Sequence, residues 1–267
     1  MRRLAAVCEI LARAAARSAG AVTWWRTRRE SRFLEGVYAE HVEANDRARR
    51  VLGTRADPPL MDPGAERCLP GCEPLPATGW TRTMLLRYAL AMHYSGRRDV
   101  LDTCSGLGWG AYLLDAVARS VTCVEMHEPS IAQSRRLWPT GRTMYVRASV
   151  LAMPLADEAF DVVTAMESIE HFRREDIVTY LAEMHRVLRP GGIVVGSSAF
   201  PYTRPGAERL RARNVHHLHV CTRSEIQRLL VRAGFSDARV FANGMFFTAR
   251  KHSPPAVTDR GSRAGAA

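Results

Sequence analysis

An alternation of short apolar segments with longer amphipathic segments, between residues 100 and 197, constrains this fold more than any other feature. Strands that alternate with helices predict a parallel sheet with helices on both faces. The expected strands are 100–101, 121–124, 144–147, 161–166 and 193–197. The expected helices follow the glycines at 106–110 as far as Val117, and occupy 130–137 and 176–188, before a stop at Pro190-Gly191-Gly192. The sequence therefore predicts an α/β protein with a doubly wound, mostly parallel sheet.

The flanking sequence divides the chain into three parts. Residues 1–80 are expected to form a helical N-terminal extension that ends in a linker, because helical spacing gives way to repeated prolines and glycines. Residues 81–250 contain the α/β domain, and residues 251–267 are polar and expected to be disordered. The domain's remaining elements are a helix at 81–94, a loop and a His-rich segment after Ala199, a helix at 224–233 and a strand or hairpin at 238–249.

Composition limits the functional classes. A net charge of +11 suggests a nucleic-acid partner, but Lys251 is the only lysine among 38 basic residues, and such an excess of arginine is typical of GC-rich coding. The sequence has no apolar run of the roughly 18–20 residues that cross a bilayer. The six cysteines show no C-x-x-C pair, which indicates reduced thiols and predicts a cytoplasmic protein. We therefore expect neither a membrane span nor a nucleic-acid partner.

A glycine turn follows the first strand, and two carboxylates flank it. Gly106 and Gly108 permit positive φ and let a ligand approach the backbone, and Asp102 precedes the first of them by four residues. Glu125 ends the second strand, so in a doubly wound sheet both acids lie at the carboxyl edge, where ligands bind. The Glu125 carboxylate can accept hydrogen bonds from both ribose hydroxyls of a nucleoside.

This turn has three interpretations. Gly106, Gly108 and Ala111 satisfy the relaxed dinucleotide pattern of an NAD enzyme. However, Asp102 would repel a pyrophosphate and attract a ligand with sulfonium and ammonium groups, which favours a nucleoside of that kind. A purely structural turn, with Asp102 as a capping residue, is the third interpretation.

Four motifs in this order resemble those of the class I S-adenosylmethionine-dependent methyltransferase superfamily, over residues 82–247. They are Asp102 to Gly108, the acid Glu125, the run MPLADEAFD at 153–161 and the run EMHRVLRPGG at 183–192. The resemblance implies a Rossmann-like methyltransferase fold and S-adenosylmethionine as the cofactor.

The resemblance also implies which residues contact the cofactor. They are Asp102, Gly106, Gly108, Glu125, Met126, Ser149, Val150 and Glu167. Two departures from the family pattern are visible. Cys104 replaces the usual first glycine of the loop. Ser149 replaces the Asp that takes the adenine amino group, so the Ser149 hydroxyl or the Val150 backbone is expected to do so.

A narrower resemblance concerns the acceptor. The segments 66–71, 87–88 and 165–172 are similar to methyltransferases of bacterial polysaccharide and natural-product gene clusters. This implies O-methylation of a small molecule or glycan. The alternative is an RNA- or protein-modifying methyltransferase whose Arg-rich N-terminal helices bind phosphate, although no base-flipping segment follows the fourth strand. A binding protein that keeps the fold without catalysis is disfavoured, because Asp102, the glycines and Glu125 are intact.

Two histidines are candidate catalytic residues. His171 follows the fourth strand at the carboxyl edge, where an imidazole can deprotonate a hydroxyl acceptor. His219 lies in a pattern similar to the family's segment after the catalytic strand, and is either structural or catalytic. Glu167, Glu170 and His171 also resemble the magnesium site of quinone-biosynthetic O-methyltransferases. Because this string is widespread in the superfamily without a metal, no metal is expected.

Overall fold

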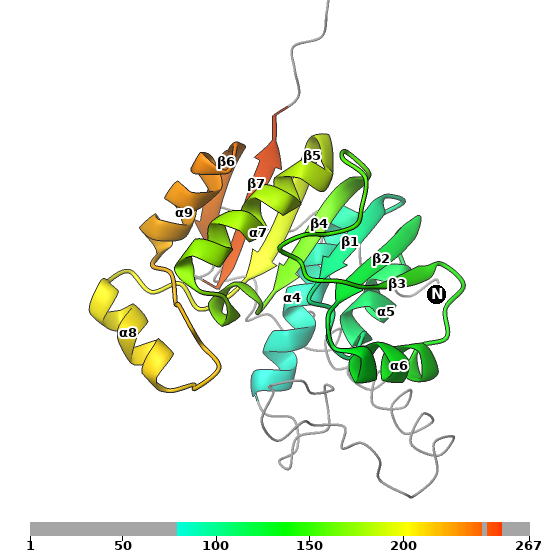
Figure 1. Cartoon of the computed structure of the whole chain (residues 1–267), viewed down its shortest axis with the longest axis horizontal. Coiled ribbons are helices and arrows are strands. Elements are labelled where there is room, and N and C mark those ends of the chain that lie inside the picture. Colours follow the sequence, from blue (N-terminus) through cyan, green and yellow to red (C-terminus); the bar gives the residue numbers. More distant parts are fainter. Residues whose placement is uncertain (1–78, 242–244, 253–267) are drawn as a thin grey trace, which may run out of the picture.

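The structure is a computed structural model that describes residues 79–241 and 245–252. The N-terminal extension expected at 1–80 and the disordered tail expected at 251–267 lie outside the described residues, apart from the innermost two residues of each. In chain order the described elements (Figure 1) are α4 (Gly79–Ser95), β1 (Asp99–Thr103), α5 (Trp109–Asp115), β2 (Ser120–Glu125), α6 (Glu128–Leu137), β3 (Thr143–Arg147), β4 (Phe160–Met166), the 3₁₀ turn η1 (Ile169–His171), α7 (Arg174–Val187), β5 (Leu188–Ser197), α8 (Arg204–Ala212), α9 (Arg223–Arg232), β6 (Phe235–Phe241) and β7 (Phe246–Lys251).

The strands form one sheet in the order β3-β2-β1-β4-β5-β7-β6. The first five strands pair in parallel, whereas β7 runs antiparallel to both β5 and β6. This confirms the predicted doubly wound, mostly parallel sheet, and the strand or hairpin predicted near the C-terminus is the β6–β7 hairpin. The strand order reverses between β1 and β4, which is the position where ligands bind in folds of this class.

Helices cover both faces of the sheet (Figure 1). On one face α7 and α9 pack against the strands, with Ile177 and Leu229 in the buried core. On the other face α4 and α5 do so, with Met92 in the core. Successive side chains of a strand point to opposite faces, so Val100 belongs to the second core and Leu101 to the first. Burial on both faces explains the apolar runs of the inner strands, whereas β3, at the edge of the sheet, is only partly buried.

One described helix was not expected, because α8 occupies part of the segment predicted as a loop. The Thr203 hydroxyl caps it by accepting a hydrogen bond from the amide of Gly206 at 3.3 Å, and Pro205 occupies its first turn. Ala207 is the only buried residue of α8, so the helix has no apolar stripe to reveal it in the sequence. No helix in the described ranges is long and apolar enough to cross a membrane.

The predicted stop after α7 lies inside a strand. Helix α7 ends at Val187, and β5 already includes Pro190-Gly191-Gly192. The segment 160–162 of β4 pairs with the segment 188–193 of β5, so the extra residues form a bulge with φ of +78° at Gly191. Helix α7 thus ends before Pro190, as expected, but Pro190 and the two glycines belong to a strand of the sheet.

A buried carboxyl group joins three elements at the centre of the sheet. Asp102 of β1 is inaccessible to solvent. Its Oδ1 accepts a hydrogen bond from Thr164 Oγ1 of β4 at 2.5 Å and one from the Tyr88 hydroxyl of α4 at 3.2 Å. Burial, assisted by the negative charge of Glu125 and opposed by the two hydrogen bonds, raises the pKa of Asp102 to about 7. The native structure therefore favours a protonated Asp102.

We expect this proton to make stability depend on pH. Between the usual pKa of 3.8 and the native value of about 7, the folded chain holds the Asp102 proton and the unfolded chain does not. The contribution of Asp102 to the free energy of unfolding therefore falls as pH rises through this window, by at most about 1.4 kcal/mol per pH unit. Asp102→Asn mimics the protonated side chain, so its stability relative to wild type should improve over the same window.

Urea unfolding followed by circular dichroism at several pH values measures this difference. Taking the difference between the two proteins removes the contributions of all other titrating groups. A stability difference that stays constant from pH 4 to pH 7 would contradict the assignment.

Candidate functional site

The carboxyl ends of three strands meet at one edge of the sheet. Thr103 near the end of β1 faces Val124 of β2 on one side and Ala165 of β4 on the other. The segments that follow these strands therefore share this edge: the glycine turn after β1, Glu125 at the end of β2, and Glu167 after β4. It is the edge at which the sequence predicts the site.

The glycine turn has left-handed backbone at three positions. The φ angle is +53° at Cys104, +54° at Gly106 and +72° at Gly108. A Cβ on Gly108 would lie 2.7 Å from the side chain of Ser134, whereas a Cβ on Gly106 would meet no atom of a described residue within 4 Å. Gly108 thus serves close packing, and the backbone at Gly106 is open to a ligand. Cys104 adopts the conformation of the glycine it replaces, at the cost of local strain.

The carboxylate of Glu125 fastens this turn to β2. Its Oε2 accepts a hydrogen bond from the amide of Gly106 at 3.0 Å. Its Oε1 accepts from the amides of Met126 and His127, both at 2.9 Å. A carboxylate has about four lone-pair sites, so Glu125 can hold the turn and still accept a hydrogen bond from a ligand.

An ion pair between α4 and the end of β4 lies at the same edge. Nη2 of Arg87 is 2.9 Å from Oε2 of Glu167, whose φ angle is +48°. Arg87 Nε and Glu167 Oε1 are buried and make no hydrogen bond with any described residue. Buried polar atoms in proteins almost always make a hydrogen bond, so a bound ligand is expected to provide one for each of these two atoms. A ligand that carries both a carboxylate and an ammonium group, as an amino acid does, would satisfy one atom with each group.

The sequence analysis assigned no role to Arg87, although Arg87-Tyr88 formed part of the narrower resemblance. Its contact with Glu167 joins residues 80 positions apart, and periodicity carries no sign of such a contact. The Arg87-Tyr88 pair of that resemblance was the available signal.

The other predicted cofactor residues lie at or beneath this edge. Met126 is exposed beside Glu125, and Val150 is buried after β3. The Ser149 hydroxyl accepts a hydrogen bond from the amide of Leu151 at 3.2 Å, which fixes the turn after β3. Asp102 lies in the core beneath the turn, so direct contact with the cofactor stays a prediction for this residue.

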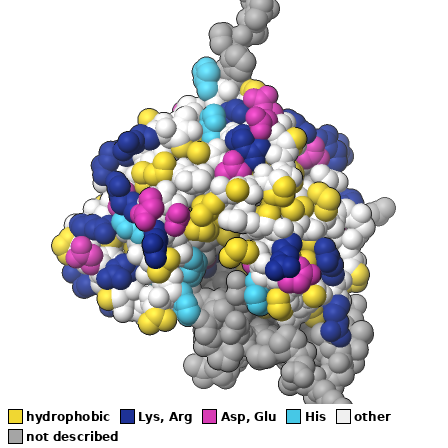
Figure 2. All heavy atoms as spheres, viewed as in Figure 1, with side chains coloured by type: hydrophobic (Ala, Val, Ile, Leu, Met, Phe, Trp, Pro, Cys, Tyr) yellow, Lys and Arg dark blue, Asp and Glu magenta, His cyan; other side chains and the backbone are white. Residues whose placement is uncertain are grey.

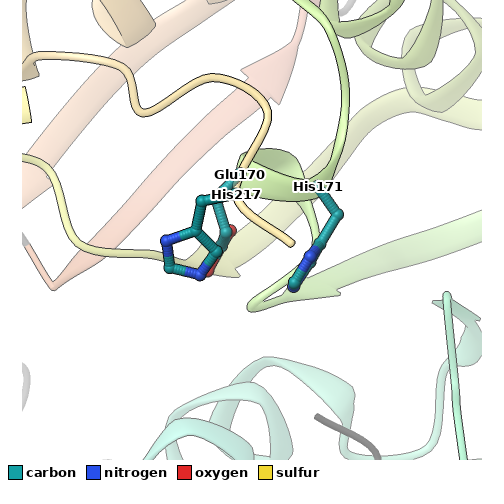
Figure 3. Close-up of side chains that lie close together, drawn as sticks. All are labelled: Glu170, His171 and His217. Carbon is teal, nitrogen blue, oxygen red and sulfur yellow. The ribbon is translucent and has the colours of Figure 1, made fainter. Parts of the chain in front are cut away.

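Three side chains from two distant segments meet beside the end of β4. Glu170 and His171 belong to η1, and His217 belongs to the loop after α8. One donor atom of each lies within 4.8 Å of the others, and all three side chains extend to the same side of the chain (Figure 3). The rings of His171 and His217 pack edge to face, with centroids 5.4 Å apart. The predicted catalytic residue His171 therefore has a second histidine beside it.

A backbone carbonyl selects the tautomer of His171. The carbonyl oxygen of His216 lies 3.2 Å from Nδ1 of His171. Because a carbonyl oxygen only accepts, this hydrogen bond places the proton on Nδ1 and makes Nε2 the basic nitrogen of the neutral ring. A general base for a hydroxyl acceptor needs a nitrogen in this state.

Glu170 connects η1 to the loop between α8 and α9 that carries His216, His217 and His219, which we call the histidine loop. Its backbone oxygen accepts hydrogen bonds from the amides of Leu218 at 2.9 Å and His219 at 3.3 Å. Burial raises the pKa of the Glu170 carboxyl well above its usual value, and the negative charge of Glu167 raises it further. Its Oε2 is buried and makes no hydrogen bond with any described residue. The protonated, neutral form of Glu170 is therefore favoured.

This cluster also has donor atoms for a divalent cation, but its hydrogen bonds oppose one at His217. Oδ1 of Asn214 accepts from the amide of His216 at 2.9 Å, which fixes the orientation of the Asn214 side chain. The amide nitrogen of Asn214 then donates to Nε2 of His217 at 3.2 Å, so the neutral His217 ring carries its proton on Nδ1. Neither ring nitrogen then offers a lone pair to a metal. Glu167, the third member of the magnesium alternative, pairs with Arg87 instead.

The second predicted catalytic residue, His219, belongs to a different group. It lies with Cys221 and Glu225, and its Nε2 is 3.1 Å from Glu225 Oε1. Glu225 also contacts Arg174 at 3.0 Å and Arg204 at 3.5 Å. This network joins α7, α8 and α9 around a buried His219. The geometry favours the structural one of the two roles considered for His219.

Comparisons with known proteins agree with this architecture. Residues 101–196 match the family model described as a methyltransferase domain. A relative from Mycolicibacterium smegmatis, named a probable S-adenosylmethionine-dependent methyltransferase, is 33% identical over 171 residues, which cover 64% of this chain and 63% of the relative. A relative of the same description from Mycobacterium tuberculosis is 31% identical over 203 residues, which cover 75% of this chain and 71% of the relative. The chain thus spans less than two thirds of the first relative's length.

A solved structure extends the comparison. The Burkholderia thailandensis 1,6-didemethyltoxoflavin-N1-methyltransferase, with bound 1,6-didemethyltoxoflavin and S-adenosylhomocysteine, is 26% identical with a TM-score of 0.50, over 64% of this chain and 79% of that chain. The identity to the mycobacterial relative extends over most of both chains, and the fold and the order of the motifs agree with it. This chain therefore belongs to the S-adenosylmethionine-dependent methyltransferases.

Proposed function

We propose that this methyltransferase transfers its methyl group to a hydroxyl of a small molecule or glycan, in the biosynthesis of a bacterial secondary metabolite or polysaccharide. The orientation of His171, with its proton on Nδ1 and its basic Nε2 at the carboxyl edge, carries this proposal. S-adenosylmethionine supplies an electrophilic methyl group, so positioning accounts for most of the catalysis. A base is needed chiefly where the acceptor must lose a proton, and a hydroxyl is such an acceptor.

The residues at the carboxyl edge fit the chemistry of this cofactor. Arg87 Nε and Glu167 Oε1, which make no hydrogen bond within the described part of the chain, suit the carboxylate and the ammonium group of its methionine part. The remaining lone-pair site of Glu125 suits a ribose hydroxyl, and Gly106 leaves room for a ligand to approach the backbone. We assign the adenine end to Ser149 and Val150, with Met126 beside it.

We place the acceptor next to His171 and His217, on the side of the site formed by η1 and the histidine loop. The backbone oxygen of Glu170 fixes that loop by accepting hydrogen bonds from Leu218 and His219. The Burkholderia thailandensis enzyme is named an N1-methyltransferase of 1,6-didemethyltoxoflavin, which supports a small-molecule acceptor here but not the choice of a hydroxyl.

One prediction of the proposed function concerns the binding of the cofactor. Glu125→Ala should weaken the binding of S-adenosylhomocysteine by about 1.5–3 kcal/mol, because charge-assisted hydrogen bonds to ribose are lost and the glycine turn loses its fastening. Isothermal titration calorimetry measures the change. Glu175→Ala removes an exposed carboxylate on α7 and should bind like the wild type. Wild-type affinity in a folded Glu125→Ala variant would refute the role of this carboxylate.

The second prediction concerns catalysis. His171→Ala should lower kcat by about 10²–10⁴-fold, because the acceptor loses its base. The affinity for S-adenosylhomocysteine should stay unchanged, since the proposed cofactor contacts do not include His171. Transfer of labelled methyl, onto an acceptor found by screening phenols, alcohols and glycans, measures the rate.

His216→Ala is the matched control for this variant. It removes an imidazole from the same loop but keeps the backbone carbonyl that orients His171. Activity should persist in this control and in the presence of EDTA. A fully active His171→Ala enzyme would remove the base from the mechanism. Activity lost in EDTA and restored by magnesium would show instead that the cluster holds a cation.

A further inference from the structure

The segment between β5 and α9 presents a surface of arginine and apolar side chains, which we call the α8 face. Its members are Tyr202, Arg209, Arg211, Arg213, Val215 and Leu218, all of them exposed. Helix α8 lies at one end of the molecule, outside the layers of the sheet (Figure 1). Basic and apolar side chains are interspersed at this end of the surface (Figure 2).

The apolar members are exposed to an unusual degree. Val215 is 88% exposed, Tyr202 75% and Leu218 50%, and the first two are the most exposed large apolar side chains among the described residues. A single exposed apolar residue needs no explanation, but several in one short segment indicate an interaction surface.

Tyr202 is held in its exposed position. The guanidinium of Arg223 lies 3.7 Å from the centre of the Tyr202 ring and donates a hydrogen bond to its hydroxyl at 2.7 Å. The ring is therefore preorganised at the surface, with its polar end satisfied. An aromatic ring with one polar end is typical of interfaces between water and lipid.

The charge on this face is not neutralised within the described part of the chain. Glu208 is the only acid of α8, and it pairs with Arg204 at 3.5 Å. The ion pairs between described residues do not include Arg209, Arg211 or Arg213. Arg209 and Arg213 are four residues apart and project from the same side of the chain. The face therefore offers positive charge to an outside partner.

The α8 face is connected directly to the site. The amide of Leu218 donates to the backbone oxygen of Glu170, and the carbonyl of His216 orients His171. A partner bound to this face would lie next to the proposed acceptor side of the site.

From these observations we propose that the α8 face binds the surface of an anionic lipid bilayer. Arginines near the headgroups gain electrostatic attraction, while Val215, Leu218 and the Tyr202 ring enter the boundary between headgroups and acyl chains. Nucleic acid is the other partner with negative charge, but a phosphate backbone offers nothing to bury these apolar side chains. The binding requires no membrane span, and it does not depend on the role of His171.

Co-sedimentation of the full chain with vesicles tests this proposal. The chain should sediment with vesicles of phosphatidylcholine and phosphatidylglycerol, and much less with phosphatidylcholine alone. The triple variant Arg209→Gln, Arg211→Gln, Arg213→Gln should lower the partition coefficient by roughly 100-fold, since each arginine near an anionic surface contributes about fivefold. The double variant Val215→Ser, Leu218→Ser should also bind vesicles more weakly. Because it leaves the charge unchanged, its loss of binding would come from the apolar side chains.

A second triple variant serves as the matched control. Arg228→Gln, Arg232→Gln, Arg239→Gln removes the same charge from exposed positions on α9 and β6 and should bind vesicles like the wild type. Circular dichroism verifies that each variant is folded. Three results would overturn the proposal: a wild-type chain that ignores anionic vesicles, equal losses in the two triple variants, or an α8-face variant that loses affinity for a duplex RNA but not for vesicles.

Discussion

The hydrogen bond between the Glu125 carboxylate and the Gly106 amide is the interaction on which the rest of the site depends. It joins the end of β2 to the turn after β1, so the two strands that form the floor of the site also fix its glycine turn. The turn needs this fastening because its backbone is left-handed at Cys104, a residue that adopts such a conformation only with strain. One carboxylate therefore shapes the turn and remains available to a ligand.

Charge is distributed unevenly around this edge. Asp102 and Glu170 are buried, and in both the pKa of the carboxyl is raised, so each favours its neutral form. Arg87 and Glu167 form an ion pair that leaves one buried polar atom on each side chain without a hydrogen-bond partner among the described residues. The site thus combines neutral structural acids with a charged pair that a zwitterionic ligand can complete. This is the physical match between the structure and the cofactor of its family.

Local patterns in the sequence were sufficient to predict the parallel sheet and the position of its functional edge. The buried strands are apolar runs, and the glycine turn directly follows one of them, so both are encoded over short distances. Helix α8 was missed, because Ala207 is its only buried residue and Pro205 and Gly206 occupy its first turn. The bulge in β5 was missed because glycine and proline end helices far more often than they interrupt strands.

Contacts between distant segments were beyond what one sequence can reveal. Arg87 forms an ion pair with Glu167, which is 80 residues away in the sequence. The ring of His217 contacts that of His171, 46 residues away, through a loop whose path depends on α8. The structure confirms that Glu125 ends β2 and that His171 follows β4, in η1, whereas their roles stay predictions. The partners that determine their chemistry, the Gly106 amide and the His216 carbonyl, are backbone groups that no residue pattern identifies.

The central claim is that this edge binds a sulfonium nucleoside with an amino-acid end. The most direct measurement is a calorimetric titration of the full chain with S-adenosylmethionine, S-adenosylhomocysteine and NAD, in wild type and in Arg87→Met. The account predicts that wild type binds both sulfur nucleosides and not NAD, and that Arg87→Met weakens both while leaving the fold intact. Tight binding of NAD, or unchanged affinity for S-adenosylmethionine without the Arg87 guanidinium, would contradict it.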